Sequence, residues 1–221
     1  MYDIFKDPVL LLALAPVLLF SLTFHEAAHA WTSNRIGDPT ARMLGRLTLN
    51  PMAHLDIFGT LMLVISNFHF GWAKPVPVDP RNFHDPKRGM FLTSIAGPAS
   101  NMLLGFACGM IVRVMVAVWG QDVTQGFHGI LFQMFGIGVV MNLSLAVFNL
   151  IPLPPLDGSK ILYGLAPPQW DLALWKLERI GPPILIALIA MGFFLNFSPI
   201  WMIMGPFVRF FSLVFAGIPL A

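Results

Sequence analysis

Charge is scarce in this chain of 221 residues. Only 11% of its residues are charged, whereas 57% are hydrophobic. Soluble domains carry about 25% charged residues, so this composition argues against a water-soluble fold and for a polytopic membrane protein. The 13 basic and 11 acidic residues form no block or stripe of one sign, and nucleic acid is therefore not an expected partner.

Cysteine is nearly absent as well. Cys108 is the only cysteine, so no disulfide can form within the chain and a disulfide-rich scaffold is excluded. It lies inside an apolar run, where a lone thiol is typical of a small packing residue.

Five runs without charged residues mark the expected membrane segments, because ionisable groups are costly at bilayer depth. They cover residues 8–24, 57–73, 89–112, 123–156 and 180–208. A helix of about 20 residues spans a bilayer, so we expect an all-α polytopic membrane protein with about five to six membrane helices and a short re-entrant or β-hairpin element near the functional site. Residues 1–221 are expected to form a single membrane-embedded domain, with a catalytic core at about 8–160 and C-terminal membrane helices at about 180–220.

The motif His25-Glu26-x-x-His29 follows the first apolar run. Two imidazoles four residues apart lie on one face of a helix, where both can reach one metal ion. Glu26 is one of only two glutamates in the chain, and at this position it can contact a metal-bound water. A glutamate flanked by two histidines in an apolar helix is costly without a function. Polar packing between helices is the structural alternative.

Two imidazoles do not complete a catalytic zinc site, which typically has three protein ligands and an open position for water. Asp157 is the best candidate for the third ligand, because it follows three prolines at the end of a long apolar run. Non-helical backbone at membrane depth survives where it is buried in protein or lines a watery cavity. Asp157 could also cap the helix that follows, and His54 with Asp56 forms the rival ligand pair.

Together these motifs resemble the site-2 protease family of intramembrane zinc metalloproteases. The resemblance covers roughly residues 20–160 and extends to four further pieces of sequence: Gly45-Arg46-Leu-Thr-Leu-Asn50-Pro51, Ala73-Lys74-Pro75-Val-Pro77, Gly97-Pro98-x-x-Asn101 and Asn149-x-x-Pro152-x-x-x-x-Asp157-Gly158. The chain lacks the PDZ or CBS module that many relatives carry.

The resemblance implies that His25, His29 and Asp157 bind one Zn2+ and that Glu26 is the general base. It also implies that Asn149 contacts the substrate or the transition state. The expected substrates are membrane proteins, cut in or near their transmembrane segments, within the lipid bilayer.

Zinc would polarise a water molecule, and Glu26 would accept its proton as the peptide carbonyl is attacked. For the developing oxyanion, Asn149 is the first candidate donor and His54 the second, and Asn101 is a further candidate for shaping the substrate site. The alternative function is a metal-ion transporter with an intramembrane His/Glu/Asp site. Against it, the other apolar runs carry few ligands and the sequence has no repeat.

The site also predicts a topology. His25 and His29 lie near the end of the first helix and Asp157 follows the fourth run, so these ends share one side of the membrane. The connection 120–124 is short and makes runs three and four a hairpin, so residues 32 and 88 also share a side. Residues 57–73 then cannot be a single crossing, and we expect a re-entrant or half-embedded segment there.

Ten of the 13 basic residues fall on that side, which the positive-inside rule assigns to the cytoplasm. We therefore expect a multi-pass protein of the plasma (inner) membrane with its site inside the bilayer, toward the cytoplasm. The alternating residues 42–49 predict strands around Gly45. An exposed edge there could bind an unwound substrate by β-augmentation.

Overall fold

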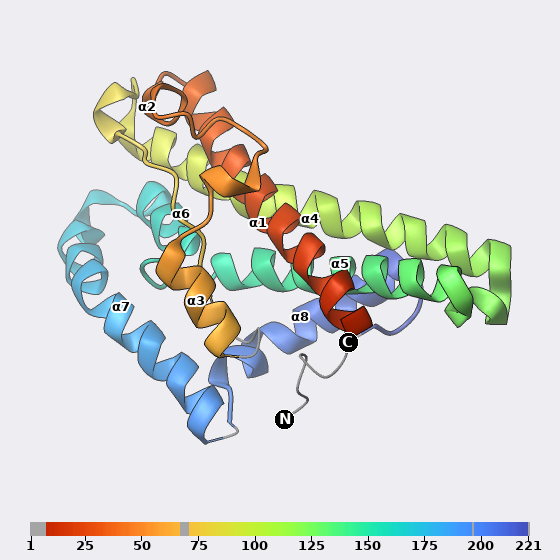
Figure 1. Cartoon of the computed structure of the whole chain (residues 1–221). Coiled ribbons are helices and arrows are strands. Elements are labelled where there is room, and N and C mark those ends of the chain that lie inside the picture. Colours follow the sequence, from red (N-terminus) through yellow and green to blue (C-terminus); the bar gives the residue numbers. More distant parts are fainter. Residues whose placement is uncertain (1–7, 67–70, 196, 221) are drawn as a thin grey trace.

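The computed structural model describes residues 8–66, 71–195 and 197–220. These residues form a bundle of helices (Figure 1). The α-helices are α1 (Pro8–Arg35), α2 (Thr40–Met43), α3 (Ile57–Ile65), α4 (Pro86–Trp119), α5 (Gly126–Asn149), α6 (Asp157–Leu165), α7 (Asp171–Phe194) and α8 (Pro199–Ala216). Short 3-10 helices lie at η2 (Pro51–Ala53), η3 (Pro80–Asn82), η4 (Gly120–Thr124) and η5 (Pro168–Trp170).

Four helices of the described chain are long and apolar enough to cross a membrane: α1, α4, α5 and α8. Their ends follow from local chemistry. The side chain of Asp85 caps α4 and that of Ser198 caps α8, each accepting a hydrogen bond from a backbone N–H of the first turn. The all-helical membrane architecture agrees with the sequence prediction, whereas the expected number of five to six membrane helices stays a prediction.

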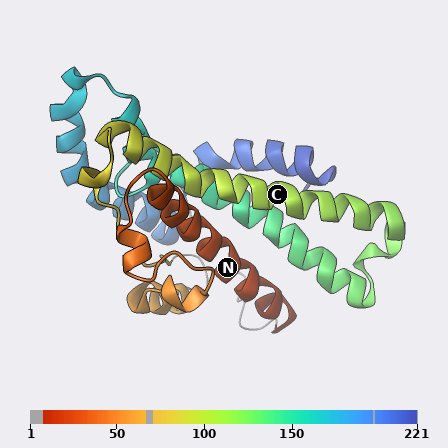
Figure 2. The same cartoon turned by 90° about the horizontal axis from the view of Figure 1, so that it is seen from above.

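Helix α4 is the centre of the bundle. It packs against α1, α5, α6 and α8. Figure 2 shows α4 and α5 running side by side, and α8 packs against both of them. Val139 and Leu143 of α5 and Val208 of α8 form a fully buried core, against which the partly buried Cys108 packs. The single cysteine therefore has the packing role that the sequence indicates.

The segment around α3 differs from the long helices. With nine residues, α3 is about 14 Å long at 1.5 Å per residue, which is too short to cross a bilayer. Asp56 caps it by accepting a hydrogen bond from Gly59 N at 2.8 Å. Residues 67–70 lie outside the described part of the run 57–73, and the half-embedded position of this run stays a prediction.

The structure has no strand in residues 42–49, so the predicted strands around Gly45 are not confirmed. Residues 40–43 form α2, and Gly45 turns the chain with a φ of 68°. Arg46 instead reaches across the fold and donates a hydrogen bond from Nη2 to the carbonyl oxygen of Lys74. In the described residues, an isolated antiparallel β-bridge pairs Leu55 with Ala73.

A polar clamp at Asp38 fixes the segment that leads from Ala73 to η3. Asp38 is fully buried and accepts hydrogen bonds from Thr40 N, Thr40 Oγ1, Asn82 Nδ2 and Asp79 N. Burial alone would raise the pKa of the Asp38 carboxyl, but these donors together hold it below its ordinary value. The clamp joins the end of α1 to η3 and so holds residues 73–79 against α1.

Candidate metal centre

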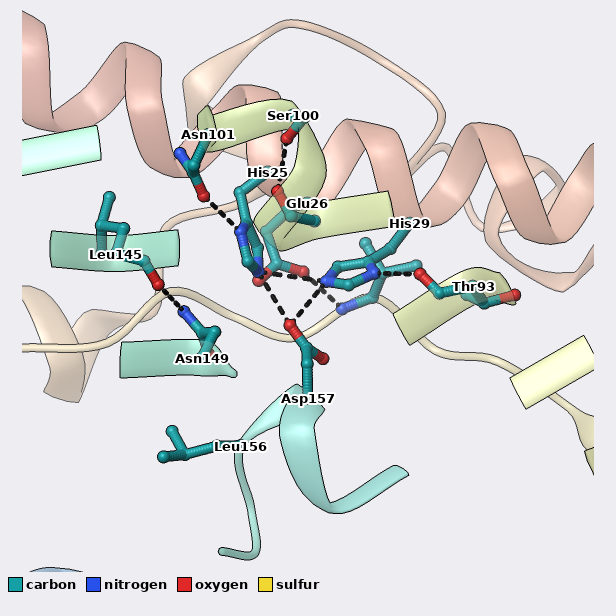
Figure 3. Close-up of polar contacts among 12 residues, drawn as sticks. His25, Glu26, His29, Thr93, Ser100, Asn101, Leu145, Asn149, Leu156 and Asp157 are labelled. Carbon is teal, nitrogen blue, oxygen red and sulfur yellow. Dashed lines mark hydrogen bonds and ion pairs between the residues drawn. The ribbon is translucent and has the colours of Figure 1, made fainter. Parts of the chain in front are cut away.

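Three side-chain atoms from two separate helices converge near the end of α1 (Figure 3). The Nε2 atoms of His25 and His29 lie 3.1 Å apart, and each lies 3.1 Å from Oδ2 of Asp157. All three residues are buried, with 6%, 7% and 8% of their surface exposed. Among the described residues, these are the His, Cys, Asp or Glu side chains grouped closely enough to hold a metal ion.

The remaining nitrogen of each imidazole faces an acceptor. His29 Nδ1 lies 2.7 Å from the carbonyl oxygen of Thr93, and His25 Nδ1 lies 2.6 Å from Oδ1 of Asn101. Because these partners accept, both Nδ1 atoms carry the proton and both Nε2 atoms present lone pairs. Two such nitrogens and a carboxylate oxygen that face one another could hold a metal ion between them.

The donor set fits zinc. Ligand atoms at about 2.0 Å from a tetrahedral ion are about 3.3 Å apart, close to the 3.1 Å edges of this triangle. Two imidazoles and one carboxylate are also the kind of three-ligand set that leaves a fourth position open. The residues present therefore fit a catalytic zinc ion.

Glu26 lies on the same turn of α1 as the two histidines. Its Oε2 accepts a hydrogen bond from Val76 N at 2.9 Å, and it lines a pocket of about 120 Å³ together with His25, His29 and Asp157. Pro75 and Val76 also line this pocket, so residues 75–76 lie next to the metal donors. We call this space the site pocket.

Helix α4 approaches the two histidines through Gly97. A Cβ atom at this position would lie 2.6 Å from Cε1 of His25 and closer still to Nε2 of His29. Such a distance lies far inside van der Waals contact, so no side chain fits between the two helices. The absence of a side chain at Gly97 lets α4 reach the metal centre.

A buried polar network behind His25 joins three helices, and of its members only Asn101 was named from the sequence, as a candidate for shaping the substrate site. Asn101 of α4 donates from Nδ2 to Asn142 Oδ1 and to Ser21 O. Asn142 of α5 in turn donates to Ser21 Oγ of α1. Both amides are buried, with exposures of 0% and 2%. Asn142 could have been found from the sequence, because it is an amide in an otherwise apolar helix. The carbonyl oxygen of Thr93 belongs to the backbone, so no sequence signal points to it.

The remaining predicted residues lie in different places. Asn149 lines the site pocket, although its Nδ2 donates to Leu145 O of its own helix. Asn101 lies behind His25 and is not among the residues that line the pocket. His54 lines a second, larger cavity.

The geometry also bears on two alternative roles that the sequence allowed for acidic residues: Asp56 as a metal ligand together with His54, and Asp157 as the cap of a helix. Asp56 caps α3 and is not part of the metal group, so the rival ligand pair His54 and Asp56 does not assemble. The cap position of α6 is taken by Leu156, and Asp157 begins the helix with its carboxylate on the histidines. Asp157 therefore does not serve as the helix cap.

A helical membrane fold with two histidines and an aspartate around one point, and a glutamate beside them, defines the class of membrane-embedded metallopeptidases. Comparison with known proteins gives the family. The sequence model of "Peptidase family M50" matches residues 13–168, and the chain belongs to this family, the site-2 proteases that its motifs resemble.

Individual relatives agree with this assignment. The chain is 44% identical over 164 residues to "Putative zinc metalloprotease YwhC" of Bacillus subtilis, covering 74% of each protein. It is 29% identical over 174 residues to "Putative zinc metalloprotease Rip2" of Mycolicibacterium smegmatis, covering 77% of this chain and 64% of that one. "Putative zinc metalloprotease MJ0611" of Methanocaldococcus jannaschii is 30% identical over 101 residues, which are 45% of this chain and 43% of that protein. The search of solved structures found no match.

Proposed function

We propose that this chain is an intramembrane zinc metallopeptidase that hydrolyses peptide bonds in or near the transmembrane segments of membrane proteins. The observation that carries the proposal is the triangle of His25 Nε2, His29 Nε2 and Asp157 Oδ2 with 3.1 Å edges. It lies in the C-terminal half of a membrane helix, beside Glu26. The whole chain acts as a single membrane-embedded peptidase domain.

Each residue of the metal centre has a proposed role in the reaction. His25, His29 and Asp157 hold the ion, which when bound supplies a Lewis acid that polarises water and the peptide carbonyl. Glu26 takes the proton from the attacking water. The Val76 amide donates to Oε2 of Glu26 and so holds the carboxylate in place beside the metal donors.

Asn149 is the proposed contact for the substrate or the transition state. It lines the site pocket, and its amide is held by Leu145 O at 3.0 Å. That hydrogen bond uses one N–H of the amide, so a second N–H is available to the developing oxyanion.

The site lies within the bilayer on its cytoplasmic side, in a protein of the plasma membrane. Arg35 ends α1, ten residues after His25, so the first ligand is about 15 Å along the helix from the charged end. A substrate helix hides its carbonyl groups in hydrogen bonds four residues apart, so it must unwind before attack. The expected substrate is therefore a transmembrane segment that unwinds easily.

The experiment that tests this function is a matched pair of glutamate variants. Native protein, Glu26→Gln and Glu178→Gln are reconstituted in liposomes with single-span substrates, and cleavage and bound zinc are measured. Glu178 is the other glutamate of the chain and is exposed on α7. We expect Glu26→Gln to keep its zinc and lose cleavage, and Glu178→Gln to keep both.

The same liposomes test the transporter alternative. Zinc flux by the native protein without any cleavage of single-span substrates would overturn the proposal. Unchanged cleavage by Glu26→Gln would also contradict it, because no other carboxylate in the site pocket is free of the metal group.

A further inference from the structure

Lys160 of α6 lies at the site pocket and has no part in the metal centre. It lines the pocket together with Glu26 and Asp157, and among the described residues that do so it is the only lysine or arginine. It comes three residues after Asp157, so both lie on one face of α6. Because side chains of a helix lean toward its N-terminus, Lys160 leans back toward Asp157.

The ammonium group of Lys160 is free to bind a partner from outside the chain. The residue is exposed, and in the described part of the chain its side chain has neither an ion pair nor a hydrogen bond. Lys87, which also lies beside α6, differs in this respect. It pairs with Asp171 at 2.8 Å and lies 4.9 Å from the centre of the Tyr163 ring. Of these two lysines, Lys160 is therefore the one that still needs a counter-charge.

The charges around the site pocket favour an anion as this partner. Glu26 and Asp157 carry one negative charge each, and together they balance the two positive charges of a zinc ion. His25 and His29 bind an ion as neutral imidazoles. Lys160 then leaves one positive charge in excess, which a carboxylate of the substrate would neutralise.

The position of Lys160 limits how far this carboxylate lies from the bond that is cut. One turn of helix, about 5 Å, separates Lys160 from Asp157. An extended substrate advances about 3.3 Å per residue. When the lengths of both side chains are included, the acidic residue lies within about three positions of the cleaved bond.

The membrane limits where such a residue occurs in the substrate. A carboxylate is costly in the hydrocarbon core, so it is expected where a transmembrane segment ends and not at its centre. A lysine likewise extends its ammonium group to the membrane interface. The two charges therefore meet at the edge of the membrane.

We propose that Lys160 is a specificity-determining residue whose ammonium group binds the carboxylate of an aspartate or glutamate near the cleaved bond. This inference rests on the proposed function and narrows its substrate class. The preferred substrate is a transmembrane segment with an acidic residue at its end, close to the bond that is cut.

Binding to an inactive protein tests the contact without relying on hydrolysis. Glu26→Gln protein in phosphatidylcholine liposomes is titrated with a dansyl-labelled single-span helix of about 20 apolar residues. Energy transfer from the tryptophans of the protein to the dansyl group reports binding. Asn, Asp or Lys is placed at successive positions toward either end of the helix. We expect Asp to bind about 2- to 5-fold more tightly than Asn at one or two positions, as an exposed ion pair would.

Substitutions of Lys160 in the same background test which residue causes the preference. Lys160→Glu should reverse it, so that the helix with Lys binds most tightly, whereas Lys160→Gln should lose it and Lys160→Arg should keep it. Lys176→Glu is the matched control and should keep the preference for Asp, because Lys176 is exposed on α7 and does not line the site pocket. A merely structural lysine would not give a preference that follows the charge at position 160.

A preference for Asp that persists in Lys160→Gln, or that is absent while Lys160 is present, would overturn the proposal. A lysine that binds lipid phosphate instead gives a Lys160→Gln effect equal for all three helices, which would also refute it. Cleavage of the same helices by the native protein is measured in parallel. Cleavage without a charge preference leaves the proposed function intact and excludes the role of Lys160, whereas a charge preference in binding without any cleavage does the reverse.

Discussion

The protonated Nδ1 of His25 donates a 2.6 Å hydrogen bond to Oδ1 of Asn101, a residue of another helix 76 positions along the chain. The bond fixes the ring so that Nε2 faces His29 and Asp157. Partners of this kind behind a metal ligand orient it and raise its basicity. The amide of Asn101 is thus part of the metal centre although it does not touch the site pocket.

Replacing Asn101 by Leu should lower zinc affinity about 10- to 100-fold, the usual effect of losing a partner behind a ligand. Zinc competition with a fluorescent chelator measures it. Asn142→Leu removes a neighbour of Asn101 and leaves the acceptor on His25 in place, so its effect should be smaller. Equal losses in the two variants would contradict a specific role for the Asn101 oxygen.

Gly97→Ala should disrupt the metal centre, because a Cβ atom there would lie 2.6 Å from the His25 ring. We expect lower zinc content and loss of cleavage. Gly105→Ala is the matched control on the same helix, since its Cβ would lie 3.5 Å from Asn142 Cβ, an ordinary contact. The zinc content of the purified proteins tests this prediction. A Gly97→Ala protein with full zinc content would show that α4 can move away from His25 without loss of the metal centre.

Asp157→Ala removes one of three donors and should weaken zinc binding by more than about 100-fold, beyond the range for residues behind the ligands. Asp171→Ala provides the control, because Asp171 makes an exposed ion pair with Lys87 at 2.8 Å. Exposed pairs contribute little to stability, so Asp171→Ala should bind zinc normally. Full zinc content in Asp157→Ala would exclude it as a ligand.

Asp38 makes stability depend on pH. Its pKa is held below the ordinary value by the hydrogen bonds it accepts, so its stabilisation is present above the unfolded pKa of about 3.9 and fades as pH falls through the folded pKa. Asp38→Asn should lower the free energy of unfolding by about 1–3 kcal/mol near pH 7, because an NH2 group then faces backbone donors.

Denaturant titration in lipid micelles measures this difference at several pH values. The gap between native protein and Asp38→Asn should narrow below about pH 4. Asp122→Asn is the control, since Asp122 is exposed and accepts a hydrogen bond from Gln125. A gap that is independent of pH would mean that the carboxylate charge of Asp38 does not stabilise the clamp.

The sequence predicts the long helices well, because charge-free runs of bilayer length leave few alternatives to a helix. The predicted strands around Gly45 show where such reasoning stops. Alternation in residues 42–49 needs a partner strand, and here Arg46 instead bonds to the backbone of Lys74 while residues 40–43 coil into α2. Local pattern alone cannot decide between these outcomes.

The candidate site also has one part that the sequence predicts and another that depends on the tertiary fold. Helical spacing by itself brings His25 and His29 together, since they are four residues apart. The network from Asn101 through Asn142 to Ser21 depends on how three helices pack, and a single sequence does not carry that information. The location of His54 in the large cavity likewise follows from the tertiary fold.

The convergence of α1 and α6 has a consequence for folding. His25 and His29 are 132 and 128 positions from Asp157, so an ion held by all three closes a loop that includes α4 and α5. Closing a long loop removes conformational freedom from the unfolded chain, and ion binding adds directly to folding free energy. The metal centre is therefore also a cross-link, which supplies the long-range connection that a chain with one cysteine cannot make covalently.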